Sequence, residues 1–594
     1  MTNPFALNQI KNPLVKKAVQ AVSKIDTLEQ WYDDWLQNSE NDHGNADAFL
    51  KYGLDRLNVK MELIHENVLD DIPRQGSFII VANHPLGGLE GLLLSQLLRT
   101  IRPDLKVLTN ELLSTIPEFQ DLFIGVDVLN TDRARYNTQG MRNVTLHLAD
   151  GGALLVFPAG SVSHIKLPSL AISDAPWSDM VSKLARKCSA PIMPIFVEGR
   201  NTLPFYLTGY IHKRLRTLLL PRAMLNKAGE TIKLYLGAPI PASDMNRLND
   251  NTIAMHYIRM CCKVLGRLKE EEDVFDQPDM EEIKQDVETA KILSHMDSLG
   301  DYLLYEQGDF KLYCAPYAEL GPVMEQLSIE RERTFRQAQE GTGRATDSDR
   351  FDPHYMHLFL WDDSSKKIAG GYRLGKTDEI AQNLGLNGLY SHSLFEYNAQ
   401  FLNDMGKTIE VGRSFITRDY QKNPAALDIL WKGIVRFVVR NPEYHTLFGC
   451  VSISREYSNL VSAMLTETFL SHYGVKDSVM RHVKARTPIK TISRPWTSEQ
   501  IASLSAIPIV NKLVGRIDTG KSIPVLIRHY LALNGRFISF TVNNGFGQSL
   551  DGLIMVDLRT SRDKYLKRYM GEAGLAEFKT QHINNNDFPI ESAR

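Results

Sequence analysis

Three uninterrupted apolar runs, each followed by a glycine-bearing turn, constrain the fold of the first half of the chain most strongly. They are residues 78–82 (FIIVA), 153–157 (ALLVF) and 192–197 (IMPIFV). Short runs without polar alternation are typical of strands covered on both faces, as in sheets flanked by helices. Helical patterns separate the runs between residues 76 and 240, which predicts an α/β domain. Side chains at the ends of its strands are candidates for function.

The length of the chain, 594 residues, exceeds what one hydrophobic core usually supports. Residues 269–290 are rich in acidic side chains, and we interpret them as a solvated helix or linker. The predicted domains are therefore 1–290, including this linker, and 291–594. A second mixture of strands and helices is expected in the latter, with strands near residues 311–314, 357–361, 368–374 and 447–452.

Composition and charge exclude several classes of protein. A formal net charge of −2 argues against nucleic acid as the main partner. The five cysteines show no metal-ligand spacing, so we predict no metal site and a reduced, cytoplasmic setting. No signal peptide begins the chain, and no run of uncharged apolar residues is long enough to span a bilayer. Any contact with a membrane is therefore expected to be peripheral.

The segment NHPLGGLE at residues 83–90 carries the strongest chemical signal. Acyl transfer to a hydroxyl requires a base, and a histidine whose other ring nitrogen binds a carboxylate suits that task. On one continuous helix His84 and Glu90 would lie about 120° apart. Gly87 and Gly88 allow a turn in which the two side chains converge. The alternative is a histidine whose hydrogen bonds are satisfied within a turn or the core.

These residues resemble the first motif of the glycerophosphate and lysophospholipid acyltransferases. Most of that family has four residues between the histidine and an aspartate, whereas five residues here precede a glutamate. The longer form resembles the hemolysin-like O-acyltransferases of ornithine-lipid synthesis. Further motifs follow in the family's order at residues 123–127 with Arg133 downstream, 157–161 (FPAGS) and 191–195 (PIMPI).

The resemblance implies a glycerolipid-acyltransferase-like α/β domain with His84 and Glu90 as its catalytic pair. It also implies a set of residues that bind substrate, namely Asn83, Arg133, Phe157, Pro158 and Gly160. Residues 199–229 lack acidic side chains and interleave basic with apolar ones. Such a segment suits an anionic membrane surface that would deliver lipid to the site, and a helix with a solvated basic face is the alternative.

In the second half, arginines and acids stand beside predicted strands, where buried charges must pair. Taken singly, each would be a surface charge. Their order resembles the acyl carrier protein-dependent N-acyltransferases that make lyso-ornithine lipid, the acyl-homoserine-lactone synthases and the wider GNAT fold. The resemblance covers roughly residues 310–560 and implies a GNAT-like α+β domain. Within it, Glu410 would accept or orient the amine proton, and substrate would be bound by Arg331, Arg373 and Arg413.

Two further patterns bear on the donor and on nucleotides. The second half lacks the Arg/Gln-x-x-Gly-x-Gly/Ala loop that cradles the pyrophosphate of CoA, which favours an acyl carrier protein as donor. Residues 515–522 (GRIDTGKS) match a phosphate loop, but Pro524 falls in the turn where its helix should begin. We therefore expect no nucleotide site there.

Together the two halves resemble a bifunctional ornithine-lipid synthase. The second would N-acylate ornithine, or a similar amino acid, with a 3-hydroxyacyl group from acyl carrier protein. The first would then acylate the 3-hydroxyl of this lyso-lipid, with acyl carrier protein or acyl-CoA as donor substrate and no cofactor. Such an enzyme is expected in the cytoplasm, peripheral to the inner membrane. The alternatives are a lysophospholipid (1-acylglycerol-3-phosphate) acyltransferase fused to an unrelated N-acyltransferase, and a non-catalytic, hemolysin-like protein that perturbs membranes.

Overall fold

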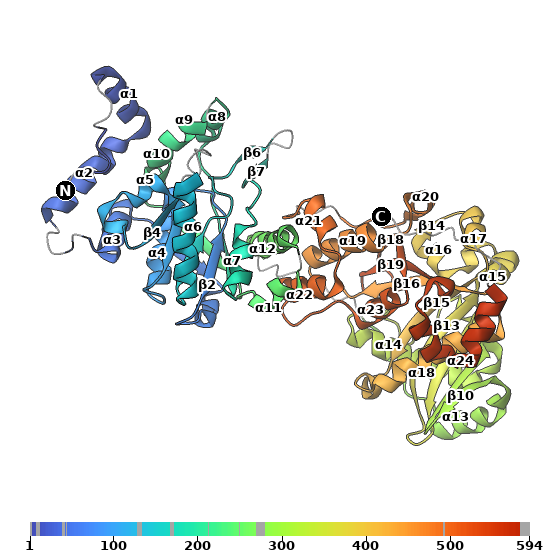
Figure 1. Cartoon of the computed structure of the whole chain (residues 1–594). Helices are drawn as coiled ribbons and strands as arrows, with labels where there is room; N and C mark the ends of the chain where they lie inside the picture. Colours follow the sequence, from blue (N-terminus) through green and yellow to red (C-terminus); the bar gives the residue numbers. More distant parts are fainter. Residues whose placement is uncertain are drawn as a thin grey trace. The chain divides into compact units, whose positions relative to one another are not determined.

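The chain forms two compact units. The computed structural model describes residues 3–7, 12–38, 42, 44–126, 134–166, 171–211, 213–248, 250–268, 280–490 and 494–582. The first unit comprises residues 1–271 and 495–503, and the second comprises 272–494 and 504–594 (Figure 1). The division thus lies nearer residue 271 than the predicted 290. Backbone amides of Glu281 and Lys284 donate to the carbonyls of Gly343 and Ala345, so the end of the acidic segment packs on the second unit.

The first unit is built on a seven-stranded sheet in the order β1-β9-β8-β2-β5-β3-β4. Its strands are β1 (Lys60–Ile64), β2 (Phe78–Ala82), β3 (Lys106–Asn110), β4 (Phe123–Val126), β5 (Ala153–Val156), β8 (Ile192–Val197) and β9 (Thr231–Leu236). All neighbours are parallel except β8 and β9. The three apolar runs are the adjacent strands β8, β2 and β5, and every residue of β2 and β5 is buried. The predicted α/β sheet is confirmed.

Helices cover this sheet and extend from it (Figure 1). Those in the body are α3 (Ala46–Leu57), α4 (Gly88–Arg99), α5 (Glu111–Ser114), α6 (Ala134–Ala149), α7 (Met180–Lys187), α11 (Ala242–Arg247) and α12 (Asn251–Leu265). At one end lie α1 (Pro13–Ser23), α2 (Ile25–Asn38), α8 (Leu203–Ile211), α9 (Lys213–Leu218), α10 (Leu220–Leu225) and the hairpin β6 (His164–Lys166)–β7 (Ala171–Ser173). Helices α1 and α2 are both amphipathic. The Tyr32 hydroxyl and Trp35 Nε1 attach α2 by donating to the buried carboxylate of Glu118.

One helix of the first unit comes from far along the chain. Helix α21 (Ser498–Ser503) packs against α12, and the Ser503 hydroxyl lies 2.9 Å from His256 Nδ1. The sequence pattern does not predict this excursion, because a six-residue helix carries too weak a pattern to show where it docks.

The second unit holds an eight-stranded sheet in the order β10-β11-β12-β13-β15-β16-β19-β18. Its strands are β10 (Leu303–Gln307), β11 (Phe310–Pro316), β12 (Met356–Asp362), β13 (Lys367–Lys376), β15 (Thr408–Ile416), β16 (Thr446–Ile453), β18 (Arg536–Asn543) and β19 (Ser549–Asp557). The strands expected near residues 311, 357, 368 and 447 are thus confirmed. The longer helices are α13 (Thr289–Met296), α14 (Gly321–Gln337), α15 (Thr377–Leu384), α17 (Ala399–Met405), α18 (Pro424–Arg440), α19 (Asn459–Tyr473), α22 (Ile507–Ile517), α23 (Val525–Ala532) and α24 (Asp563–His582).

The neighbouring strands β15 and β16 run parallel, and they stay paired over only a short stretch. β15 and β16 are in register only from Thr408–Thr446 to Glu410–Phe448, yet they run on to Ile416 and Ile453. Arg413 in β15 takes a positive φ of 47°, which bends that strand. A pocket opens where the two strands separate.

Candidate active sites

The first site lies where β2 ends and α4 begins. Nδ1 of His84 lies 2.8 Å from Oε1 of Glu90, the third residue of α4. The Glu90 carboxylate is fully buried, whereas the imidazole keeps 19% of its surface exposed. With Nδ1 bound to the carboxylate, Nε2 is left to accept a proton from a substrate hydroxyl. The predicted convergence of the two side chains is confirmed, while their catalytic role remains a prediction.

The turn between the two residues depends on Gly87. Its backbone φ of 102° lies in a region that residues other than glycine rarely adopt. A Cβ at this position would lie 2.7 Å from Leu220 Cδ2. The backbone amides of Leu86 and Gly87 each donate to Glu90 Oε1 at 3.0 Å. The carboxylate therefore closes the turn and orients the imidazole at the same time.

A second loop supports His84 from the other side. The ring of Phe157 lies 4.6 Å from the imidazole, centroid to centroid. Asp174 Oδ1 accepts from the backbone amide of His84 at 3.4 Å and from the Ser163 hydroxyl at 2.5 Å, while Trp177 Nε1 donates to its Oδ2 at 3.0 Å. Sequence reasoning missed Asp174, because it lies 90 residues from His84 and outside the recognised motifs.

The other residues expected at this site have mixed placements. The side-chain amide of Asn83 is hydrogen-bonded to the backbone of Val197. Its Oδ1 accepts from Val197 N at 2.7 Å, and its Nδ2 donates to Val197 O at 2.9 Å. Its amide thus joins β2 to β8 instead of facing a substrate. Pro158 is buried and its carbonyl accepts from Ser178 N, whereas Gly160 is exposed in the turn after β5. Arg133, with Asp127 of the second motif, lies outside the described residues.

The second site contains a buried cluster of three arginines and three aspartates. Arg331 binds Asp347 and Asp352, Arg373 binds Asp349 and Asp352, and Arg413 binds Asp347 and Asp349, all at 2.6–3.1 Å. Burial alone would raise the pKa of Asp352, but the guanidiniums of Arg331 and Arg373 hold that pKa far below its usual value. The cluster is therefore balanced in charge. The structure brings together the three predicted arginines, and the aspartates are partners that sequence reasoning left unassigned.

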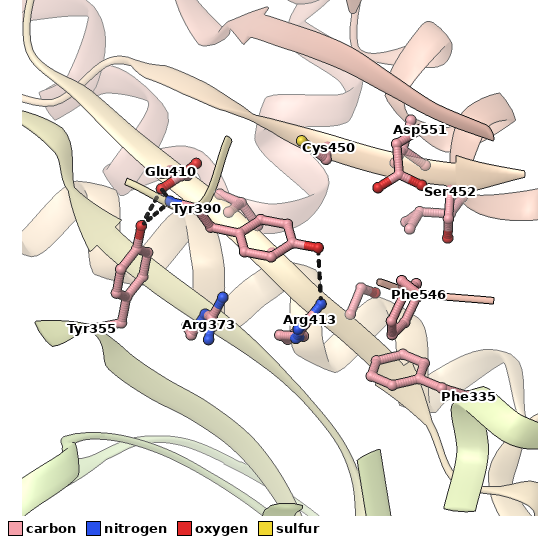
Figure 2. A pocket seen from close by; sticks show the side chains of 15 residues that line it. Phe335, Tyr355, Arg373, Tyr390, Glu410, Arg413, Cys450, Ser452, Phe546 and Asp551 are labelled. Atoms are coloured by element: carbon pink, nitrogen blue, oxygen red, sulfur yellow. Dashed lines mark hydrogen bonds between the residues drawn. The ribbon is translucent and has the colours of Figure 1, made fainter. Parts of the chain in front are cut away.

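Two of these arginines also line the pocket between β15 and β16. The pocket has a volume of about 580 Å³ including its open mouth, and Glu410, Cys450, Ser452 and Asp551 line it with them (Figure 2). Nε and Nη2 of Arg373 have no hydrogen-bond partner among the described residues, although the side chain is 1% exposed. A buried donor without a partner is costly, which makes this guanidinium a candidate for binding a carboxylate.

Glu410 lies at the point where the two strands part. Its Oε2 accepts from the Tyr355 hydroxyl and from Tyr390 N, and its Oε1 accepts from Ser391 N at 2.6 Å. The opposite end of Tyr390, its hydroxyl, accepts from Arg413 Nη1 at 3.2 Å (Figure 2). Glu410 therefore holds the start of the helix that carries Tyr390.

Among the described residues that line the pocket, Cys450 alone carries a thiol. Burial raises its pKa well above the ordinary value, with Asp551 and Glu410 adding to the effect. A neutral thiol is a poor nucleophile. The arrangement favours direct attack by an acceptor on an acyl thioester over transfer through an acyl-cysteine.

Two family models match the chain, one to each unit. A model described as "Acyltransferase" matches residues 62–267, and one described as "Acetyltransferase (GNAT) domain" matches residues 331–432. A glycine N(alpha)-acyltransferase of Phocaeicola vulgatus is 29% identical over 257 residues, covering 40% of this chain and 76% of the relative. A lyso-glycine lipid O-acyltransferase of that organism is 28% identical over 206 residues, covering 33% and 72%. The protein is an acyltransferase.

Further comparisons agree with this conclusion. An L-ornithine N(alpha)-acyltransferase of Agrobacterium fabrum is 26% identical over 243 residues, covering 39% of the acyltransferase and 75% of the relative. In the acyltransferase, an α/β acyltransferase domain precedes a GNAT domain, as predicted. The non-catalytic, membrane-perturbing alternative is set aside.

The phosphate-loop pattern has no matching structure. Gly515 and Arg516 lie in the last turn of α22, so a helix and not a strand leads into the segment. Helix α23 begins at Val525, after Lys521 and Ser522 instead of at them. Among the residues that the structure describes, no cluster of histidine, cysteine, aspartate or glutamate side chains forms a metal site.

Proposed function

We propose that this acyltransferase makes a two-chain aminolipid in two steps. The GNAT unit N-acylates an α-amino acid of the ornithine or glycine type with a 3-hydroxyacyl group. The first unit then acylates the new 3-hydroxyl. One observation carries the proposal: a single chain holds a histidine–carboxylate pair suited to a hydroxyl and, in its other unit, an arginine-lined pocket suited to an amino acid.

The charged side chains of each site suit the acceptor proposed for it. Glu90 stabilises the imidazolium that forms when His84 takes the proton of the hydroxyl, and the oxygen then attacks the thioester carbonyl. In the GNAT unit, the N–H groups of Arg373 that lack partners bind the carboxylate of the amino acid. Relatives named for glycine, ornithine and lyso-glycine lipid support this pairing of steps.

We propose acyl carrier protein as the donor to the GNAT unit. Residues 417–423, which link β15 to α18, contain no glycine. Pro424 opens α18 without an N–H group, and the side chain of Asn423 accepts from Ala425 N at 3.0 Å. Because this helix start is already capped, it offers few free amides to the pyrophosphate of CoA. A thioester delivered on a protein-held arm does not need them.

The first unit is proposed to meet an anionic membrane, in the cytoplasm and at the inner membrane. Leu203 and Leu207 of α8 are 61% and 53% exposed, and Leu14 of α1 is 79% exposed. Helix α1 packs against α10 and α8 against β6 (Figure 1). Gly87, in the His84 turn, lies against Leu220 of α10, so the turn is at this end of the unit. Basic side chains flank these leucines, as an anionic bilayer surface requires. In the described part of the chain, no helix has the length and apolar character needed to cross a bilayer.

The experiment is expression of the full chain in a host that makes no aminolipid. A ninhydrin-positive, phosphorus-free lipid with two acyl chains should form, and mass spectrometry of it would identify the amino acid. His84→Ala should accumulate the singly acylated lipid. Absence of any aminolipid would contradict the proposal, and growth in phosphatidic acid alone would favour the lysophospholipid acyltransferase alternative.

A further inference from the structure

A second buried carboxylate, Asp551 of β19, lines the pocket between β15 and β16. The Ser549 hydroxyl donates to its Oδ1 at 2.7 Å, and Asn543 Nδ2 donates to its Oδ2 at 2.9 Å. A carboxylate oxygen can accept two hydrogen bonds, so each still has capacity for a donor from a bound ligand. The same pocket contains the Arg373 N–H groups that lack partners, which points to a ligand with both a carboxylate and an ammonium.

Asp551 and Glu410 lie at opposite ends of Tyr390 and interact with it in different ways. The backbone amide of Tyr390 donates to Glu410, whereas its hydroxyl accepts from Asn543 Nδ2, the group that also donates to Asp551. Oε2 of Glu410 already accepts two hydrogen bonds, one of them from the Tyr355 hydroxyl. A proton placed there would displace a donor that holds the fold. Glu410 is therefore a positioning residue for Tyr390 and Arg413 (Figure 2).

A second acid, Glu340, lies close enough to Asp551 for the two charges to interact. The groups that face Asp551 are Arg413, Tyr390, Cys450 and Glu340. Burial, and then the charge of Asp551, raises the pKa of Glu340 to about 8, while a hydrogen bond from the Ser452 hydroxyl opposes the rise. Burial also raises the pKa of Asp551.

Arg413, the cation whose charge acts on both acids, already has partners. Arg413 forms ion pairs with Asp347 and Asp349, and within the described residues no ion pair joins Asp551 or Glu340 to a cation. A ligand ammonium would supply the missing positive charge.

We propose that Asp551 is the general base of N-acylation. The inference rests on the proposed function of the GNAT unit. One N–H proton of the acceptor ammonium moves to Asp551, which frees the nitrogen lone pair. The nitrogen bonds to the thioester carbonyl carbon, and the C–S bond then breaks. The second proton lost by the nitrogen goes to the departing thiolate, which leaves as the donor's free thiol.

The test measures N-acylation by the full chain against pH, with 3-hydroxyacyl-acyl carrier protein as donor and glycine or ornithine as acceptor. Asp551→Asn keeps the shape of the side chain and should lower kcat by about 100- to 10,000-fold, with less than about threefold change in acceptor KM. Its residual rate should rise about tenfold per pH unit toward the pKa of the amine, because only the free amine then reacts. Exposed Asp419→Asn, in the same unit, is the matched control and should match the wild type.

Four results would overturn the proposal. Asp551→Asn could keep the wild-type rate, or it could lose activity while retaining the wild-type pH profile, as a structural role predicts. The tenfold rise per pH unit could instead appear in Glu410→Gln, which would move the base to Glu410. Failure of the wild type to acylate either amino acid would overturn the proposed function as well. Failure at Asp551 alone would leave wild-type N-acylation intact.

Discussion

His84 Nδ1 and Glu90 Oε1 form a 2.8 Å hydrogen bond in which the carboxylate is buried and the imidazole reaches solvent. The same carboxylate oxygen also accepts hydrogen bonds from two backbone amides, which fix its position. The histidine is thus set with one ring nitrogen bound and the other directed to a substrate. This geometry makes the pair the first target for mutation.

Glu90→Gln removes the charge that stabilises the imidazolium while it keeps an oxygen for the Leu86 and Gly87 amides. We expect the O-acylation rate of this variant to fall by about 100-fold or more, and the rate of His84→Ala to fall further. Lyso-lipid should accumulate in both, and N-acylation should be unchanged. Glu66→Gln, at an exposed acid of the same unit, is the control. Equal O-acylation by Glu90→Gln and wild type would show that the carboxylate is only structural.

Gly87→Ala tests the turn that brings the pair together. A φ of 102° strains any side chain, and the new Cβ would lie 2.7 Å from Leu220 Cδ2. We expect a loss of about 1–3 kcal/mol in the free energy of unfolding, together with reduced O-acylation. Gly229→Ala has a similar φ of 79° but meets no atom within 4 Å, so it isolates the strain from the clash. Adding Leu220→Ala to Gly87→Ala should recover part of the loss, and no recovery would contradict the contact.

The stability of the GNAT unit should depend on pH through His357. Burial, followed by the charge of Arg331, lowers its pKa to about 4, whereas the unfolded chain has the ordinary value of about 6.5. Between these values the unfolded state binds more protons. Stability should therefore fall as pH drops from about 6.5 to about 4, by about 3 kcal/mol.

Urea unfolding across this pH range would measure the effect. His357→Gln keeps a donor for the Asp352 carbonyl, 3.0 Å from His357 Nε2, but cannot be protonated. This variant should weaken the dependence of the unfolding free energy on pH. Part of that dependence should remain, because the pKa values of His445 and His529 are also lowered to about 4. An unchanged slope in this variant would exclude His357 as a source.

The exposed leucines of α8 predict how the first unit meets a bilayer. Leu203→Asp with Leu207→Asp should weaken sedimentation with phosphatidylglycerol-containing vesicles by about tenfold or more, because two apolar anchors become charged. Leu384→Asp, at an exposed leucine of the GNAT unit, is the matched control. High salt should weaken binding of the wild type by screening its basic side chains. Equal sedimentation of the α8 double variant and wild type would reject this surface.

Local patterns predicted the elements well. The buried strands β2, β5 and β8 follow from runs of apolar residues, and the turn after β2 follows from its glycine pair. Such features depend on neighbours in sequence, so a sequence displays them directly. The direction of a side chain at a strand end is not a local property, and for that reason Asn83 was expected at a substrate but binds the backbone of β8.

The sequence by itself determined the two acyltransferase halves and their order. It also predicted His84, Glu90, Arg373 and Arg413 as site residues, because each lies in a short motif. Only the tertiary structure showed which further acids lie beside these residues. Asp174 reaches His84 across 90 residues, and Asp551 meets the Arg413 strand only because β19 pairs with β16 in the same sheet. Burial and pairing of charge depend on contacts between distant segments, and these arise when the chain folds.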